Sequence, residues 1–94
     1  MQSVLIVAVL LAGGGPATDT IYSCTDMADP LMVRFQDASV QLRGDRQWMT
    51  LPQARSGSGA RFTDGTVLFW IKGSNARYET GDGVIRKCHV TGRG

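Results

Sequence analysis

The sequence has few of the side chains on which enzyme active sites depend. Among its 94 residues there is one histidine, His89, and one glutamate, Glu79. Most of the seven aspartates stand in turn contexts beside glycine or proline, where a carboxylate bonds the local backbone. A nucleophilic Ser56 or Ser58 would need a neighbouring base, and His89 is the sole candidate. This inventory argues against an enzyme, and nothing in it indicates a cofactor.

Cysteine is equally scarce, with only Cys24 and Cys88 in the chain. Two widely separated cysteines offer no zinc-ligand spacing, so no metal site is expected. In an oxidising compartment the two thiols would form one bridge tying together the ends of the domain. Closing a loop of about 65 residues is worth on the order of 4 kcal/mol in the chain-entropy account. Two buried free thiols are the alternative.

The sequence also lacks a hydrophobic run long enough to cross a bilayer. Val4–Ala12 contains nine apolar residues, whereas a membrane-spanning helix needs roughly 20. The glycines that follow make the run typical of a secretory signal peptide, cleaved after Gly14 or Ala17, although no basic residue precedes it. A buried N-terminal strand or helix is the alternative. We therefore expect a signal peptide over 1–17, a mature domain over 18–94, and no stable membrane insertion once the signal is removed.

A concentrated basic surface is absent as well. The net charge is +2, and the ten basic residues are scattered along the chain between acidic ones. A mixed, solvated surface of this kind differs from the basic stripe of a nucleic-acid-binding protein. No nucleic-acid partner is expected.

No helical periodicity appears beyond Thr18; short extended segments alternate with turn residues instead. Asp64-Gly65 is a strong signal for a two-residue hairpin turn. Strands at intervals of about ten residues indicate one all-β domain, an antiparallel sandwich or barrel, and a closed barrel has no exposed edges. The expected extended segments are 20–24, 31–35, 40–42, 48–51, 61–62, 66–72, 76–78 and 84–90.

The most distinctive loop is Ser56–Gly59, SGSG, which we name the SGSG loop. Loops that bind phosphate normally lead into the N-terminus of a helix, and no helix is expected after this loop. Its glycines allow the backbone to approach a partner closely, and Lys72, ahead of Gly73, would project from the rim of the sheet. A rim of small hydroxyls with one cation suits a narrow acidic cleft. A flexible turn beside an ordinary solvated lysine is the alternative.

Four motifs in combination resemble the bacterial lysozyme inhibitors of the MliC/PliC family. They are YSC (22–24), SGSGARF (56–62), FWIKG (69–73) and the late Cys88. The resemblance spans 22–88, essentially all of the expected mature chain.

This resemblance implies an eight-stranded antiparallel β-barrel with one disulfide, between Cys24 and Cys88. It also implies a protein partner, c-type lysozyme, into whose active-site groove the loops insert. Ser58 and Lys72 then reach the enzyme's catalytic carboxylates. The implied lysozyme-binding residues are Ser56, Gly57, Ser58, Gly59, Ala60, Lys72 and Gly73.

One departure from the family pattern concerns localisation. Membrane-anchored members carry a lipid-modified cysteine directly after the signal, where this sequence has Gly14. A soluble periplasmic or secreted protein is therefore expected. Related inhibitors of g- and i-type lysozymes have similar loops, which leaves the lysozyme type open. The alternative function is an envelope β-barrel module that binds a small ligand or a glycan fragment.

Overall fold

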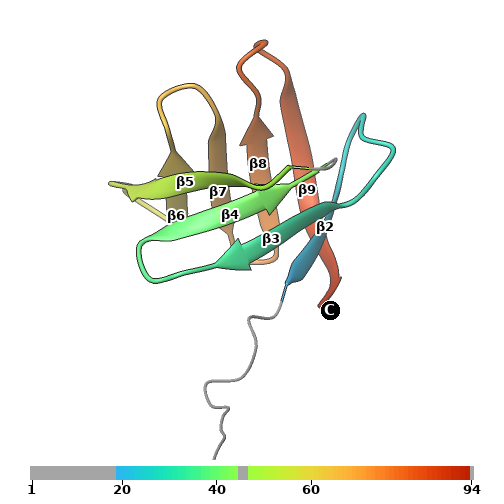
Figure 1. Ribbon diagram of the computed structural model, residues 1–94, viewed down its shortest axis with the longest axis horizontal. Coiled ribbons are helices and arrows are strands. Elements are labelled where there is room, and N and C mark those ends of the chain that lie inside the picture. Colours follow the sequence, from blue (N-terminus) through green and yellow to red (C-terminus); the bar gives the residue numbers. More distant parts are fainter. Residues whose placement is uncertain (1–18, 45–46, 94) are drawn as a thin grey trace, which may run out of the picture.

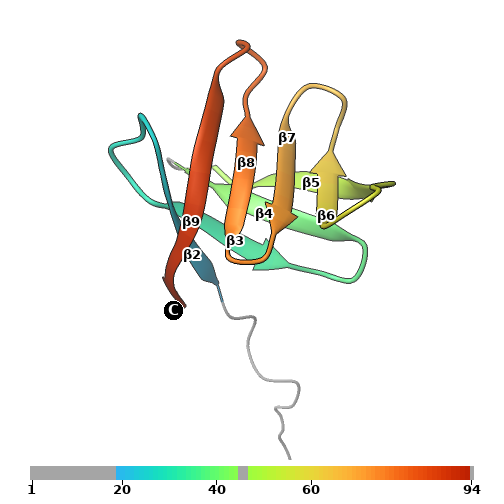
Figure 2. The same cartoon turned by 180° about the vertical axis from the view of Figure 1, so that it is seen from behind.

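Eight antiparallel strands form a closed barrel in the computed structural model, which describes residues 19–44 and 47–93 (Figures 1 and 2). Each strand pairs with its neighbour in sequence, and the last pairs with the first. This confirms the predicted all-β barrel, whereas the predicted signal peptide, 1–17, lies outside the described residues. The strands are β2 (Thr20–Cys24), β3 (Leu31–Phe35), β4 (Ser39–Arg43), β5 (Met49–Ala54), β6 (Ala60–Thr63), β7 (Leu68–Lys72), β8 (Asn75–Glu79) and β9 (Ile85–Arg93).

Alternation along the strands builds the core. In β3 the buried Leu31 and Val33 are separated by the half-exposed Met32, and in β4 Val40 and Leu42 are fully buried. Period-two burial is what a strand produces when one face meets the core and the other meets water. Phe69 is completely buried at the centre, and the rings of Tyr22 and Tyr78 pack edge-on against it, with centroids 5.3 and 6.2 Å away.

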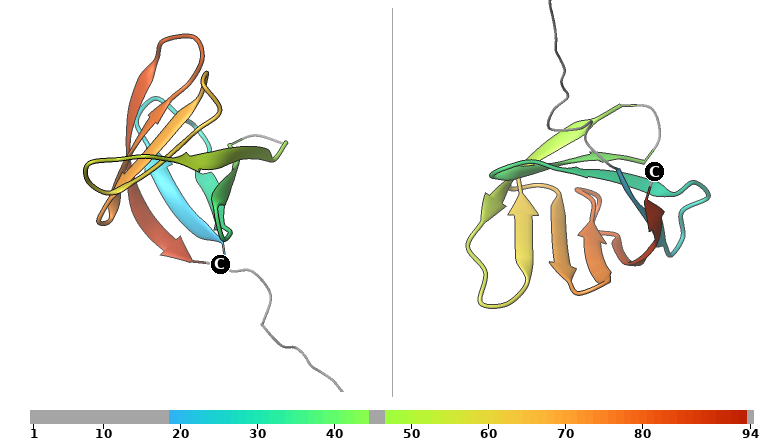
Figure 3. Two further views of the ribbon diagram at one scale, coloured as in Figure 1. Left: turned by 90° about the vertical axis from the view of Figure 1, so that its left-hand side faces the viewer. Right: turned by 90° about the horizontal axis from the view of Figure 1, so that it is seen from below.

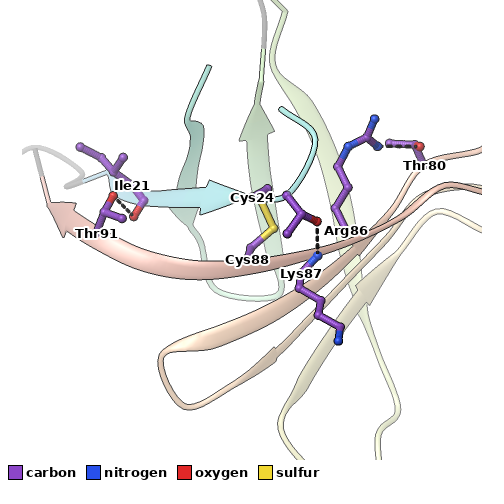
Figure 4. Close-up of a disulfide and its surroundings, with 8 residues drawn as sticks. Ile21, Cys24, Thr80, Arg86, Lys87, Cys88 and Thr91 are labelled. Carbon is purple, nitrogen blue, oxygen red and sulfur yellow. Dashed lines mark hydrogen bonds between the residues drawn. A yellow bond between two sulfur atoms is a disulfide. The ribbon is translucent and has the colours of Figure 1, made fainter. Parts of the chain in front are cut away.

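The barrel closes where β2 and β9 lie side by side (Figure 3). Cys24 and Cys88 stand directly opposite each other in this pair and form a disulfide, which confirms the predicted bridge (Figure 4). Just beyond the disulfide, the backbone N–H of Lys87 donates to the Thr25 hydroxyl at 3.1 Å. The covalent link therefore joins the two strands that are farthest apart in sequence.

The turn between β6 and β7 differs from the sequence prediction. Thr63 pairs with Leu68, so four residues connect the strands where a two-residue turn was expected. Asp64 is the cause, because its carboxylate accepts hydrogen bonds from the backbone N–H groups of Thr66 and Val67, both at 2.8 Å. Strand β7 consequently begins at Leu68, two residues later than predicted.

The strand connections divide between the two ends of the barrel. The loop after β5 and the turn after β7 emerge at one end, with the β3–β4 connection. The connections after β2, β6 and β8 emerge at the other, as Figure 2 shows for the last two. The SGSG loop and the end of β7 therefore share one rim of the molecule.

Candidate functional site

The predicted site residues come from two neighbouring connections and the strand ends beside them. Residues 55–59 join β5 to β6, and residues 73–74 join β7 to β8. Ala60, the first residue of β6, pairs with Ile71, the last residue but one of β7. This register places the SGSG loop beside Lys72, although 13 positions separate Gly59 from Lys72 in the sequence.

Ser56 organises the SGSG loop from within. Its hydroxyl accepts a hydrogen bond from the backbone N–H of Ser58 at 3.2 Å and donates to the carbonyl oxygen of the same residue. A serine that bonds the backbone two residues ahead forms a local turn that competes with extended structure. The loop is thus a defined turn, with its serines exposed.

Gly59 holds the loop against β7. It has a φ of 67°, and a Cβ built on it would lie 2.2 Å from the carbonyl oxygen of Ile71 and 2.9 Å from Cγ of Lys72. Only glycine combines this backbone conformation with such a close approach. The backbone of the loop therefore rests directly on the segment that carries Lys72.

Trp70 connects the two predicted contact residues. Its indole N–H donates a 2.8 Å hydrogen bond to the carbonyl oxygen of Ser58. The ammonium of Lys72 lies 4.7 Å from the centroid of the same ring, and the guanidinium of Arg61 lies 5.8 Å from it. A cation within about 6 Å of an indole face is attracted by the ring's quadrupole. One half-buried tryptophan thus orders both the loop and the lysine.

The structure gives the other predicted residues distinct places. Ser56, Gly57, Ser58 and Gly59 are exposed in the loop, and Lys72 and Gly73 are exposed at the end of β7. Gly73 has a φ of 63°, which the tight turn into β8 requires. Ala60 differs from the others, because it is half-buried and packs against the core.

Trp70 was missed as a site residue by the sequence analysis. Alternation in 68–72 requires that one of Phe69 and Trp70 point inward, but it does not say which. The structure buries Phe69 and leaves Trp70 on the outer face with Lys72. Their spacing of two, which puts both side chains on one face of a strand, was the available signal.

The rim consists of exposed polar groups. Within residues 19–44 and 47–93, no group of three or more histidine, cysteine, aspartate or glutamate side chains could hold a metal ion. The same part of the chain contains no helix long and apolar enough to span a bilayer. Among the groups that the rim exposes are the hydroxyl of Ser58 and the ammonium of Lys72.

Comparison with known proteins identifies the family. The profile described as "MliC: Membrane-bound lysozyme-inhibitor of c-type lysozyme" matches residues 22–87 of this chain. The chain belongs to the MliC family. A family of inhibitors consists of binding proteins, and membership therefore confirms that the chain is a binding protein rather than an enzyme.

Two curated MliC relatives carry the same name, membrane-bound lysozyme inhibitor of C-type lysozyme. The protein from Escherichia coli (strain K12) is 34% identical over 99 residues, covering 93% of this chain and 89% of that protein. The protein from Yersinia enterocolitica (serotype O:8 / biotype 1B, strain NCTC 13174 / 8081) is 35% identical over 71 residues, covering 74% and 61% respectively.

A solved MliC structure shares the fold. It is the crystal structure of Pseudomonas aeruginosa MliC in complex with hen egg white lysozyme. The similarity has a TM-score of 0.58 at 21% identity and covers 97% of this chain and 100% of that one. The MliC barrel is thus common to both chains.

Proposed function

We propose that this protein inhibits c-type lysozyme by inserting the SGSG loop and Lys72 into the active-site groove of the enzyme. Family membership and the names of the two relatives support the target. The observation that supports these contact residues is that Ser58 and Lys72 both contact one ring, that of Trp70. Two chemically suitable groups are thereby presented together on one rim.

The proposed chemistry follows from how a retaining glycosidase works. Its two catalytic carboxyl groups lie about 5 to 5.5 Å apart, and one of them must stay protonated to act as the acid. An ammonium between them lowers the pKa of both and so removes the proton that catalysis needs. The Ser58 hydroxyl, which can both donate and accept, would bind one carboxylate oxygen.

Pre-organisation makes the arrangement suitable for tight binding. A flexible loop and a free lysine would each lose conformational entropy on entering a cleft, at about 0.5 to 1.5 kcal/mol per immobilised side chain. Here the internal bonds of Ser56, the close approach at Gly59 and the Trp70 contacts already restrict both groups. Much of that cost is therefore met during folding.

The test is an inhibition titration of c-type lysozyme with a soluble oligosaccharide substrate. Lys72→Met keeps the aliphatic stem and removes the charge, while Ser58→Ala removes only the hydroxyl. Each should weaken inhibition by about 2 to 5 kcal/mol, because an enzyme carboxylate is left without its partner. Unfolding midpoints should stay near that of the parent, since both side chains are exposed.

Arg43→Gln is the matched control, since it removes one positive charge at the opposite end of the barrel and should leave inhibition unchanged. A Ser58→Ala/Lys72→Met double variant as inhibitory as the parent would overturn the assignment. Parallel titrations of g- and i-type lysozymes decide the target class, and we expect inhibition of the c-type enzyme alone.

We also propose that the protein acts in the periplasm or outside the cell. The apolar run Val4–Ala12 and the disulfide both fit an exported protein, because such bridges persist in oxidising compartments. Mass spectrometry of the protein recovered from the periplasm should show cleavage after Gly14 or Ala17. An uncleaved chain in the cytoplasm would contradict this.

A further inference from the structure

The outer face of β7, β8 and β9 contains a groove that the proposed inhibition does not use in full. It has a volume of about 760 Å³ and begins beside Lys72 and Trp70. It then crosses the sheet toward the last strand, where Ile85 is 52% exposed. The lining residues that matter here are Trp70, Lys72, Arg77, Ile85, Lys87 and His89.

Strand register arranges these side chains in two rows across the sheet. In one row Trp70 stands opposite Arg77, which stands opposite Lys87. The next row begins at Lys72 and passes through Asn75 to His89. Neighbouring strands are about 4.8 Å apart, so each row spans roughly 10 Å and presents its side chains together.

The groove carries charge of one sign. Lys72, Arg77 and Lys87 line it, and no carboxylate does. Glu79, outside the lining, pairs with Arg77 at 2.6 Å, whereas neither lysine forms an ion pair within the described part of the chain. The sequence as a whole has nearly as many acidic as basic residues, 8 against 10, so this local excess is a property of the fold.

We infer that this groove binds a carboxylate-bearing glycan, the polymer that lysozymes cleave. The choice of this polymer as the ligand rests on the proposed function. The second argument is charge complementarity between the positive groove and the carboxylates of the polymer. Ammonium and guanidinium groups form charge-assisted hydrogen bonds with carboxylates. The Asn75 amide and the Thr25 hydroxyl, which also line the groove, suit sugar hydroxyls.

The geometry disfavours single-stranded nucleic acid as the occupant. Such strands are held mainly by bases stacked on open aromatic faces. The ring of Trp70 is the only aromatic ring in the lining besides the imidazole of His89, and the ammonium of Lys72 lies over it. The groove therefore offers charges and hydrogen bonds more readily than a stacking platform.

Glycan binding would place the inhibitor where its target works. An inhibitor held on the polymer meets an attacking lysozyme at a raised effective concentration, without any new contact to the enzyme. Arg77 and Lys87 lie on β8 and β9, while the SGSG loop lies between β5 and β6. These two cations are therefore distinct from the proposed lysozyme contacts, whereas Lys72 belongs to both surfaces.

The test measures co-sedimentation of the purified protein with insoluble peptidoglycan sacculi. We expect binding at low ionic strength that is largely lost in about 0.5 M salt, where surface charges are screened. Arg77→Gln/Lys87→Gln should bind about tenfold more weakly, since two surface ion pairs are removed. Lys87→Gln alone should give a smaller loss, and Arg43→Gln should bind like the parent.

Two further probes identify the occupant. Neutral chitin should not retain the protein, because it lacks carboxylates. Binding to vesicles of anionic phospholipid but not to sacculi would overturn the inference, as would sacculus binding that Arg77→Gln/Lys87→Gln leaves intact. The soluble-substrate inhibition assay separates the two proposals, because the double variant should still inhibit lysozyme whether or not the groove binds glycan.

Discussion

Gly59 is the residue on which the position of the SGSG loop depends. A methyl group at this position would occupy the space of the Ile71 carbonyl oxygen, in a backbone conformation that L-residues rarely adopt. We expect Gly59→Ala to lose about 1 to 3 kcal/mol of folding free energy. It should also weaken lysozyme inhibition, because the loop must move away from β7 and from Lys72. Urea denaturation and an inhibition titration measure the two effects.

Gly57 provides a matched control within the same loop. A Cβ added there meets nothing within 4 Å, and its φ is not positive. Gly57→Ala should therefore change the stability by no more than about 0.5 kcal/mol and leave inhibition close to that of the parent. Equal losses in both variants would show that any side chain in the loop is harmful, and the specific role of Gly59 would be wrong.

At this scale the sequence indicated the exposed contacts but not what supports them. The serines, the glycines and Lys72 were found because their residue types are unusual in combination. The hydrogen bond from Trp70 to Ser58 was not predictable, because it depends on which face of β7 meets the core. In the folded barrel Phe69 is fully buried and Trp70 lies on the outer face, so the packing of the strands around the core makes that choice.

Among the elements, the turn between β6 and β7 carries a pH-dependent contribution to stability. Hydrogen bonds from the backbone N–H groups of Val67 and Thr66 hold the pKa of Asp64 below its ordinary value of 3.8. A carboxyl group whose pKa is lower in the folded state stabilises that state at pH values above its unfolded-state pKa. That contribution is lost as the pH falls through the folded-state pKa. The parent should therefore lose stability below about pH 4.

Asp64→Asn isolates this contribution. The asparagine side-chain oxygen can accept the same two backbone hydrogen bonds, so the turn should persist, but the residue no longer titrates. Thermal unfolding between pH 7 and about pH 2 should show a smaller acid-induced fall in Tm for the variant than for the parent. Asp82, whose pKa is also lowered, chiefly by the Thr80 hydroxyl, titrates equally in both. Parallel curves of Tm against pH for the parent and the variant would contradict the assignment of this contribution to Asp64.

Hydrophobic periodicity predicts where the strands lie better than it predicts where they begin and end. Every expected extended segment overlaps a strand, because alternation of buried and exposed residues is visible in sequences such as LMVRF. The ends of the strands were less predictable. Val67 is buried yet lies in the turn, since the Asp64 carboxylate captures its backbone N–H before β7 begins.

For the whole molecule, the pattern predicted seven or eight antiparallel strands, the family resemblance implied eight, and closure was favoured because a small open sheet exposes its edges. The register of the strand pairs was not predictable from the sequence. The alignment of Ala60 with Ile71 belongs to the pairing of β6 with β7 in the closed barrel, and it brings the SGSG loop beside Lys72. The candidate site is therefore a product of the fold and cannot be located from either motif separately.

The disulfide stabilises the barrel as a whole. It links β2 to β9 across 64 positions and lies on the closing pair, whereas the proposed lysozyme contacts lie around the β5–β6 connection and the end of β7. Cys24→Ser/Cys88→Ser should lose about 4 kcal/mol of folding free energy, because the unfolded chain regains its loop entropy.

The same variant should retain parental inhibition at temperatures where circular dichroism shows it fully folded. Of the strands β5 to β8, only β8 pairs with a strand that carries a bridge cysteine, through the Ala76–Cys88 pair with β9. Denaturation and inhibition, measured on one sample across temperature, should then fall together. Loss of inhibition well below the unfolding transition would instead show that the closing pair positions the rim directly, and that the barrel transmits strain from β9 through β8 to Lys72.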